Sequence, residues 1–285
     1  MISDTFIETI QENLFILKKE VHQRCHPYAK NKKTFFIIGC QRSGTNLMLR
    51  LFANDLNTKT FDELSILSSE DEQKIRLNPL HVVNEEILRA RAPLIILKPL
   101  VETQNILSLL EYFKGSKGLW MYRNYKDVAS SNLSHFGKEN GISDLRPIVE
   151  NNPGDWRSEK VSKEVREIIL QYFSDHMNPY DAAVLFWYSR NKLFFELGLD
   201  QNPNVFMCKY ADLVTSPTKV IPTIYQFIDF KYSGNQIHEV IYTKSLKRGI
   251  DLELTPEIDQ LAGDLLNQLD QIYHTKLELV ASGKQ

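Results

Sequence analysis

Short runs of β-branched, aromatic and leucine residues recur along the chain, and longer amphipathic segments separate them. Such runs are typical of strands buried on both faces, and they predict strands at 34–38, 59–61, 94–98, 118–122 and 205–209. Apolar spacings of three and four predict helices at 2–23, 46–54, 80–91, 103–113, 125–135, 160–175, 180–198, 217–230 and 256–279. Strands that alternate with helices imply crossover connections. We therefore expect a three-layer α/β fold, with a central parallel sheet of about five strands flanked by helices.

One stretch breaks these patterns. Gly, Asn, Pro and Asp interrupt residues 137–156, which predicts a long loop, and long loops in compact enzymes are often lids or binding loops. We interpret 137–180 as an insertion that shapes a binding pocket or lid. We expect residues 1–30 to form an N-terminal helical segment and residues 1–285 as a whole to be a single domain.

Composition narrows the functional classes. The formal net charge of −2 argues against a dedicated nucleic-acid binder. No apolar run reaches the length of a membrane span, and charged residues interrupt the N-terminal segment, unlike a signal peptide. The cysteines at 25, 40 and 208 lie far apart without metal-ligand spacing, which predicts reduced thiols and no metal site. We expect a cytoplasmic protein without a membrane or nucleic-acid partner; the sequence leaves its oligomeric state open.

The segment Gly39–Thr45 (GCQRSGT) carries the first chemical signal. It lies between a predicted strand and a predicted helix, where backbone N–H groups and the helix dipole attract an anion. Glycines allow close approach of the backbone, and Arg42 adds a permanent positive charge. The spacing Gly39 to Gly44 resembles a P-loop, but Thr45 replaces the lysine of nucleotide-hydrolysing P-loops. The sequence therefore predicts a modified, P-loop-like fold that binds a phosphorylated ligand.

Two motifs resemble those of sulfotransferases that use 3′-phosphoadenosine 5′-phosphosulfate. Residues 41–45 resemble the family's loop for the 5′-phosphosulfate, which implies a binding role for Gln41, Arg42, Ser43, Gly44, Thr45 and Asn46. Residues 123–131 (RNYKDVASS) resemble its 3′-phosphate motif, in which the first arginine and the last serine hold the phosphate. That carries over to Arg123 and Ser131.

Three further segments agree with this resemblance. The strand that ends at residues 209–213 (KYADL) implies that Tyr210 lies near the adenine, although Ala211 replaces an acidic residue of the family. Lys247, Arg248 and Gly249 resemble a late basic loop that closes over the 3′-phosphate; a solvated charge pair is the alternative. Lys98 ends a predicted strand, where the family often places a lysine facing the sulfate.

The resemblance implies metal-free, in-line transfer to a small-molecule acceptor, with Arg42 and Lys98 as catalytic cations. A hydroxyl acceptor also needs a base. Leu100 occupies the position of the histidine base of cytosolic relatives, whereas Glu63 matches the glutamate of tyrosylprotein and heparan sulfotransferases, which makes Glu63 the leading catalytic base. Other possible bases are Asp62, Glu102, His81 and His135.

The sequence says least about the identity of the acceptor. Aromatic residues in the 137–180 segment, together with Asp144, Glu150 and Asp155, would suit a flat or cationic molecule, including a saxitoxin-like guanidinium alkaloid, although ordinary loop packing explains them equally well. Either O- or N-sulfation fits. Two other functions stay open, a P-loop kinase and a nucleotide-binding protein without turnover.

Overall fold

The computed structural model describes residues 4–25, 32–69, 75–234, 237, 249 and 251–283. Five strands form one parallel sheet in the order β2-β3-β1-β4-β5. Their bounds are β1 Lys33–Gly39, β2 Thr58–Phe61, β3 Leu94–Leu97, β4 Lys117–Tyr122 and β5 Val205–Lys209. Each predicted strand and the parallel α/β architecture are thus confirmed.

Helices connect the strands and cover the sheet. Their bounds are α1 Asp4–Cys25, α2 Thr45–Ala53, α3 Leu80–Arg89, η1 Leu100–Asn105, α4 Ile106–Tyr112, α5 Tyr125–Phe136, α6 Asn140–Val149, α7 Lys163–Tyr172, α8 Pro179–Glu196, α9 Tyr210–Thr215, α10 Pro217–Phe227 and α11 Pro256–Ala281. The short helix α9 follows β5 directly and was not predicted from the sequence.

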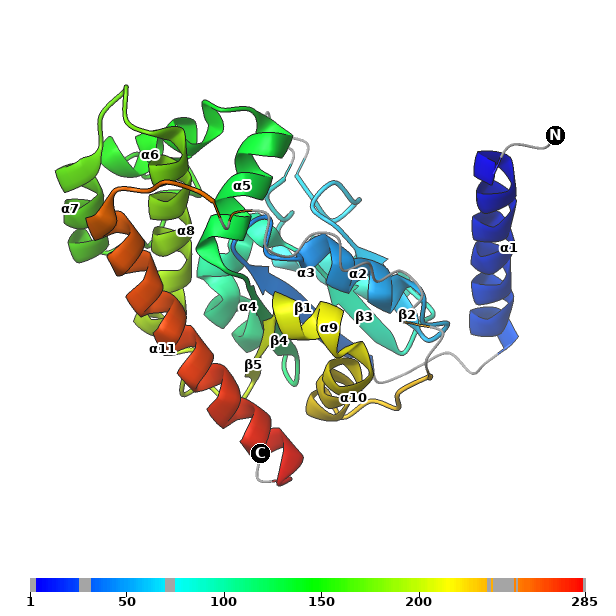
Figure 1. Ribbon diagram of the computed structural model, residues 1–285. Coiled ribbons are helices and arrows are strands. Elements are labelled where there is room, and N and C mark those ends of the chain that lie inside the picture. Colours follow the sequence, from blue (N-terminus) through cyan, green and yellow to red (C-terminus); the bar gives the residue numbers. More distant parts are fainter. Residues whose placement is uncertain are drawn as a thin grey trace.

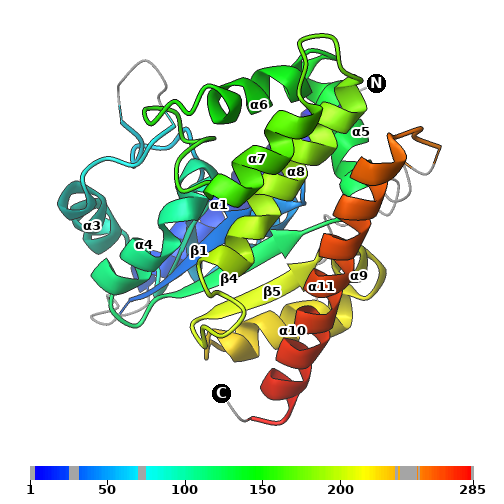
Figure 2. The ribbon, with the colours of Figure 1, turned by 90° about the vertical axis from the view of Figure 1, so that its left-hand side faces the viewer.

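The strands are buried on both faces, so alternate residues enter different cores. Phe36 and Ile38 of β1 pack in the core that lies under α3, α4, α8 and α11. Phe35 and Ile37 pack in the opposite core, under α2 and α10. Figures 1 and 2 show the resulting three layers, with α5, α6 and α7 gathered beyond one end of the sheet. The continuous apolar composition of the strands follows from this double burial.

The prediction of an irregular loop at 137–156 is wrong, because α6 occupies 140–149. Its buried residues Ile142, Leu145 and Ile148 follow helical spacing. Gly141 hid that pattern, yet it serves packing: a Cβ there would lie 2.7 Å from the carbonyl oxygen of Pro179 on α8. Pro147 falls in the last turn of α6, where it removes one hydrogen bond without ending the helix early.

Candidate functional site

The carboxyl ends of the five strands meet at one edge of the sheet, and the candidate residues follow them. In strand order this edge carries Glu63 after β2, Lys98 after β3, the Gly39 loop after β1, Arg123 after β4 and Tyr210 after β5. Ligands of open α/β sheets bind in the crevice at this edge. Four strand spacings cover about 19 Å, so these groups face one extended strip of the molecule.

The loop after β1 has backbone geometry that favours glycine at its two ends. Gly39 has φ +127°, and a Cβ there would lie 2.3 Å from the carbonyl oxygen of Met121 on β4. Gly44 has φ +95° and is the N-cap of α2. Arg42 between them is left-handed as well, with φ 65°. The loop therefore curls tightly at the amino end of α2, the geometry that presents backbone N–H groups to an anion.

Hydrogen bonds from residues outside the loop hold its backbone and one of its side chains. The N–H of Gly39 donates to Thr103 Oγ1 at 3.2 Å, and Gln41 Nε2 donates to Asp144 Oδ2 at 2.7 Å. Ser43 is fully buried, and its hydroxyl has no hydrogen-bond partner among the described residues. Buried hydroxyl groups normally make a hydrogen bond, and a bound phosphate would supply the acceptor that the Ser43 hydroxyl lacks.

Cys40 does not add chemistry to this loop. Burial raises the pKa of its thiol to about 12, which keeps the sulfur protonated at neutral pH. Cys208 is buried as well, whereas Cys25 is exposed, so the expectation of buried or semi-buried thiols is wrong for Cys25.

The second anion motif begins where β4 ends. Arg123 is 6% exposed and its Nη2 lies 3.4 Å from Asp127 Oδ2, one turn along α5. The other oxygen of Asp127 accepts a hydrogen bond of 3.1 Å from the N–H of Gly249. Gly249 has no room for a side chain, because a Cβ would lie 2.2 Å from the carbonyl oxygen of Lys126. Gly249 thus lies against the 123–131 motif; Lys247 and Arg248 lie outside the described residues.

Three contacts join the two motifs. Arg42 Nε donates to Ser131 Oγ at 3.1 Å, which links the first loop to the last residue of the second motif. The ring of Tyr210 packs directly against Gly44, since a Cβ on Gly44 would lie 2.2 Å from Tyr210 Cδ2. The same ring carries the Arg123 guanidinium, 4.5 Å from the ring centre. Arg42 and Arg123 therefore adjoin one continuous region rather than two separate ones.

Lys98 joins the loop to the candidate base. It is 4% exposed, and its ammonium group contacts both the Glu63 carboxylate and the Asn46 side-chain oxygen on the first turn of α2. A small cavity of about 10 Å³ adjoins this pair. Its lining residues are Phe61, Asp62, Glu63, Leu67, Ser68, Ile75, Leu77, Leu97, Lys98 and Pro99. Glu63 and Lys98 thus lie together beside a cavity with room for about one water molecule.

The alternative bases lie in less suitable surroundings. Asp62 Oδ1 accepts a hydrogen bond of 3.0 Å from the N–H of Leu64, a turn contact. His81 and His135 are exposed on helices. The carboxylate of Glu102 is engaged on both oxygens, as described next. Of the sequence-derived candidates, Glu63 is the one that contacts the strand-end lysine.

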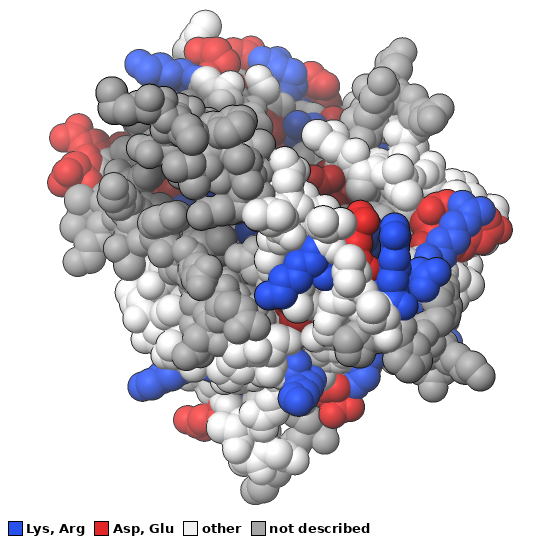
Figure 3. Space-filling view, turned by 90° about the vertical axis from the view of Figure 1, so that its right-hand side faces the viewer, with Lys and Arg blue, Asp and Glu red and all other residues white. Residues whose placement is uncertain are grey.

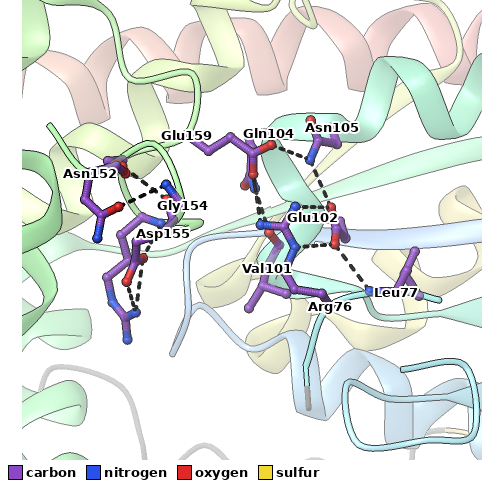
Figure 4. A network of polar contacts seen from close by, with 12 residues as sticks. Arg76, Leu77, Val101, Glu102, Gln104, Asn105, Asn152, Gly154, Asp155 and Glu159 are labelled. Atoms are coloured by element: carbon purple, nitrogen blue, oxygen red, sulfur yellow. Dashed lines mark hydrogen bonds and ion pairs between the residues drawn. The ribbon is translucent and has the colours of Figure 1, made fainter. Parts of the chain in front are cut away.

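A network of polar side chains holds Glu102 next to this cavity (Figure 4). Arg76 binds Glu102 through Nε at 2.7 Å and Nη2 at 3.2 Å, and its Nη1 lies 3.0 Å from Glu159. Asn105 donates to both carboxylates, and Gln104 donates to Glu159. We call Arg76, Glu102, Gln104, Asn105 and Glu159 the Arg76 clasp. Burial tends to raise the pKa of Glu159, but hydrogen bonds from Gln104 and Asn105 and the charge of Arg76 lower it overall.

The acidic residues expected to attract a cationic acceptor are partly engaged within the protein. Asp144 is 2% exposed and accepts hydrogen bonds from Gln41, from Asn140 and, at 2.7 Å, from Arg157. Asp155 pairs with the same arginine. Trp156 is buried, with Arg157 against its ring. Asp144 therefore acts as an internal support for the loop after β1, a role that its sequence position did not indicate.

Sequence reasoning missed Thr103, Asp127 and Asp144 as supports of the site. Asp127 lies inside the quoted 123–131 motif, so its spacing of four from Arg123 was an available signal. Thr103 and Asp144 reach the loop from 64 and 103 residues away, and no local pattern marks them. Within the described part of the chain, no group of three or more His, Cys, Asp or Glu side chains is arranged to hold a metal ion. None of the described helices combines the length and apolar character of a membrane span.

Comparison with known proteins identifies a matching protein family. The family profile described as "Sulfotransferase domain" matches residues 32–249, which include all five strands and both anion motifs. No curated protein sequence matches the chain at a significant level.

Solved structures resemble the chain in their backbone. The sulfotransferase domain of the Synechococcus PCC 7002 olefin synthase is 18% identical with a TM-score of 0.49, over 86% of this chain and 97% of that one. A sulfotransferase from Alicyclobacillus acidocaldarius is 14% identical with a TM-score of 0.48, over 84% and 95%. A mouse sulfotransferase in complex with PAP is 13% identical with a TM-score of 0.42, over 90% and 88%.

Proposed function

The chain belongs to the sulfotransferase family, and from that premise we propose that it moves the sulfuryl group of 3′-phosphoadenosine 5′-phosphosulfate to a hydroxyl or nitrogen of a small molecule. The observation that carries this proposal is the contact between the two anion motifs, Arg42 with Ser131 and Tyr210 with both Gly44 and Arg123. A nucleotide with phosphates at both ends of its ribose requires two basic groups beside one continuous space.

The residues at the strand ends fit such a donor. The buried hydroxyl of Ser43 and the N–H groups at the start of α2 offer donors to the 5′ side. Arg123 offers a buried guanidinium to the 3′ side, and Tyr210 between them offers an aromatic face to a base. No described residue supplies the lysine of a kinase P-loop, because Thr45 occupies that position.

The proposed chemistry assigns one task to each group. When bound, the donor supplies an activated sulfuryl group whose bond to the bridging phosphate oxygen breaks, with its electron pair leaving on that oxygen, as the acceptor atom bonds to sulfur. Arg42 and the loop N–H groups would stabilise the negative charge on the leaving phosphate. Lys98 would offset charge near the bridging oxygen, because its contact with Asn46 holds it against the first turn of α2. Glu63 would take the proton from the acceptor.

The cavity beside Glu63 does not select an acceptor. Phe61, Leu67, Ile75 and Leu77 line it, but its volume of about 10 Å³ admits about one water molecule, so the acceptor would bind outside it. A guanidinium alkaloid of the saxitoxin type remains our finer hypothesis, but Asp144 and Asp155 are already paired with Arg157 and offer it little support. Phenols, alcohols and amines are therefore tested together.

A labelled-donor screen tests the proposal. Phenols, alcohols and amines, including guanidinium compounds, are incubated with the protein and sulfur-labelled donor, and labelled product is separated from unused donor. We expect label on at least one acceptor and release of 3′-phosphoadenosine 5′-phosphate, without added magnesium. Calorimetry then measures binding of that nucleotide and of magnesium-ATP. Tight binding of magnesium-ATP in place of the 3′-phosphorylated nucleotide would favour a kinase, and donor binding without turnover would favour a regulatory protein.

A further inference from the structure

A further link between the two anion motifs passes through helix α6. Gln41 of the loop after β1 donates to Asp144 Oδ2 at 2.7 Å, and Asn140 Nδ2 donates to the same oxygen at 2.8 Å. Asn140 Nδ2 also donates to Asn132 Oδ1 on α5, at 2.7 Å. Asn132 is buried and directly follows the last residue of the 123–131 motif. Asp144 therefore connects the first motif to the second.

This link lies beside the direct contact of the motifs. Arg42 donates to Ser131, and two residues of the indirect link, Gln41 and Asn132, are their neighbours in sequence. Groups that must act together are held most accurately when further hydrogen bonds support them. A ligand that reaches two groups at once binds most tightly when their separation is already correct. The link through Asp144 therefore bears on how well one nucleotide can reach both motifs.

The carboxylate of Asp144 depends on a cation. It is 2% exposed, and Arg157 Nε donates to its other oxygen at 2.7 Å. A buried carboxylate is costly unless a charged partner and hydrogen bonds compensate it, so loss of Arg157 would leave Asp144 without its ion pair. Surface charges differ: on the face shown in Figure 3, described basic and acidic side chains lie intermixed in contact with solvent, where ion pairs contribute little. Removal of the Arg157 charge should therefore disturb the link, whereas removal of a surface charge should not.

Arg157 is itself held in place. Its backbone N–H donates to Asp155 Oδ1 at 2.8 Å, and its Nη1 lies 3.3 Å from the same oxygen. Its guanidinium lies over the buried ring of Trp156, 4.6 Å from the ring centre. The buried guanidinium of Arg190 on α8 lies 5.1 Å from the centre of that ring. These contacts fix the orientation in which Arg157 presents Nε to Asp144.

We infer that Arg157 is a positioning residue of the donor site: it holds Asp144, which in turn sets the separation between the loop after β1 and the end of the 123–131 motif. The inference rests on the proposed function, because it concerns binding of 3′-phosphoadenosine 5′-phosphate. Arg157 acts through Asp144 and not on the nucleotide itself. A looser separation therefore weakens a nucleotide that needs both motifs more than one that needs only the loop.

Calorimetry with 3′-phosphoadenosine 5′-phosphate and adenosine 5′-phosphate tests this inference. Arg157→Met removes the ion pair but keeps most of the length of the side chain. It should weaken the first nucleotide at least about tenfold and the second less than about threefold. Arg146→Met is the matched control, because Arg146 on α6 pairs at 2.9 Å with Asp175 and both side chains are exposed. The control should leave both affinities unchanged. A purely structural role of Arg157 would not change the ratio of the two affinities.

Two further variants keep the test decisive if Arg157→Met folds poorly. Asn140→Ala removes the connection to Asn132 and should also weaken the doubly phosphorylated nucleotide, at least about threefold more than adenosine 5′-phosphate. Arg157→Met combined with Asp144→Asn leaves no buried carboxylate without its ion pair, and the introduced amide oxygen can still accept from Gln41. This double variant should bind 3′-phosphoadenosine 5′-phosphate at least about threefold more tightly than Arg157→Met alone.

The outcomes separate this inference from the proposed function. Equal changes for the two nucleotides in Arg157→Met and in Asn140→Ala, or no recovery in the double variant, would overturn the positioning role of Arg157. A wild type that binds neither nucleotide would instead overturn the proposed function on which the inference rests.

Discussion

Lys98 lies between two side chains whose proposed tasks differ. Its contact with Asn46 ties it to the amino end of α2, and its contact with Glu63 ties it to the segment after β2. A cation held from both sides loses little freedom when the reaction begins, which is the condition for effective electrostatic stabilisation. The second contact also holds the Glu63 carboxylate beside Lys98.

Replacing the proposed base should separate chemistry from binding. Glu63→Gln keeps the size of the side chain but removes its capacity to take a proton. We expect turnover to fall at least about tenfold, while affinity for 3′-phosphoadenosine 5′-phosphate stays nearly unchanged. Steady-state rates and calorimetry measure the two quantities, and Asp62→Asn is the matched control at the adjacent acid. Loss of nucleotide affinity in Glu63→Gln would show a structural role instead.

Gly44 offers a steric test of the loop. An alanine Cβ would collide with the Tyr210 ring, so we expect Gly44→Ala to weaken nucleotide affinity at least about tenfold. Gly115→Ala is a matched control, because Gly115 also has positive φ, +80°, but no atom within 4 Å of the added Cβ. Both variants should lose about 1–2 kcal/mol of stability from the left-handed backbone. Equal nucleotide affinity in the two variants would contradict the proposed role of the Tyr210 contact.

At the scale of elements, the carboxyl ends of the strands determine where the candidate site residues lie. Each strand was predictable because its apolar run is local, and the parallel order follows from the alternation with helices. The loop after β1 was predictable for the same reason: Gly39, Arg42 and Gly44 are close in sequence. The contact of Arg42 with Ser131 spans 89 residues, and a single sequence carries no local sign of it.

Helix α6 shows where local reasoning fails. Gly141 and Pro147 are strong breakers by propensity, yet tertiary packing overrides them, because Gly141 permits close contact between α6 and α8. The hydrogen bond from Gln41 in the loop to Asp144 depends on that helix, since Asp144 lies on α6. An irregular loop at this place would not have held Asp144, so the error in secondary structure also hid a support of the site.

The Arg76 clasp should make stability depend on pH. The folded pKa of Glu159 is below its ordinary value, so the folded state binds fewer protons than the unfolded state near that value. Its contribution is therefore complete above about pH 4.5 and is lost as pH falls further. Urea unfolding from pH 7 to pH 3 should show a smaller acid-induced loss in Glu159→Gln than in the wild type. Identical losses in the two proteins would contradict this role of Glu159.

At the scale of the whole molecule, the order of the strands sets the order of the tasks. Glu63 and Lys98 lie beyond β2 and β3, the Gly39–Thr45 loop lies beyond β1, and Arg123 and Tyr210 lie beyond β4 and β5. The proposed base thus lies at one end of the strip and the proposed 3′ site toward the other. Such an order would let one nucleotide span the sheet edge with its reactive end toward Glu63.

The most direct measurement compares two nucleotides that differ only in the 3′-phosphate. Calorimetry would determine the affinity of 3′-phosphoadenosine 5′-phosphate and of adenosine 5′-phosphate for the wild type, for Arg123→Ala and for Arg42→Ala. If Arg123 binds the 3′-phosphate, Arg123→Ala weakens the first nucleotide at least about tenfold and the second less than about twofold, whereas Arg42→Ala weakens both. Equal weakening of the two nucleotides by Arg123→Ala would contradict the account.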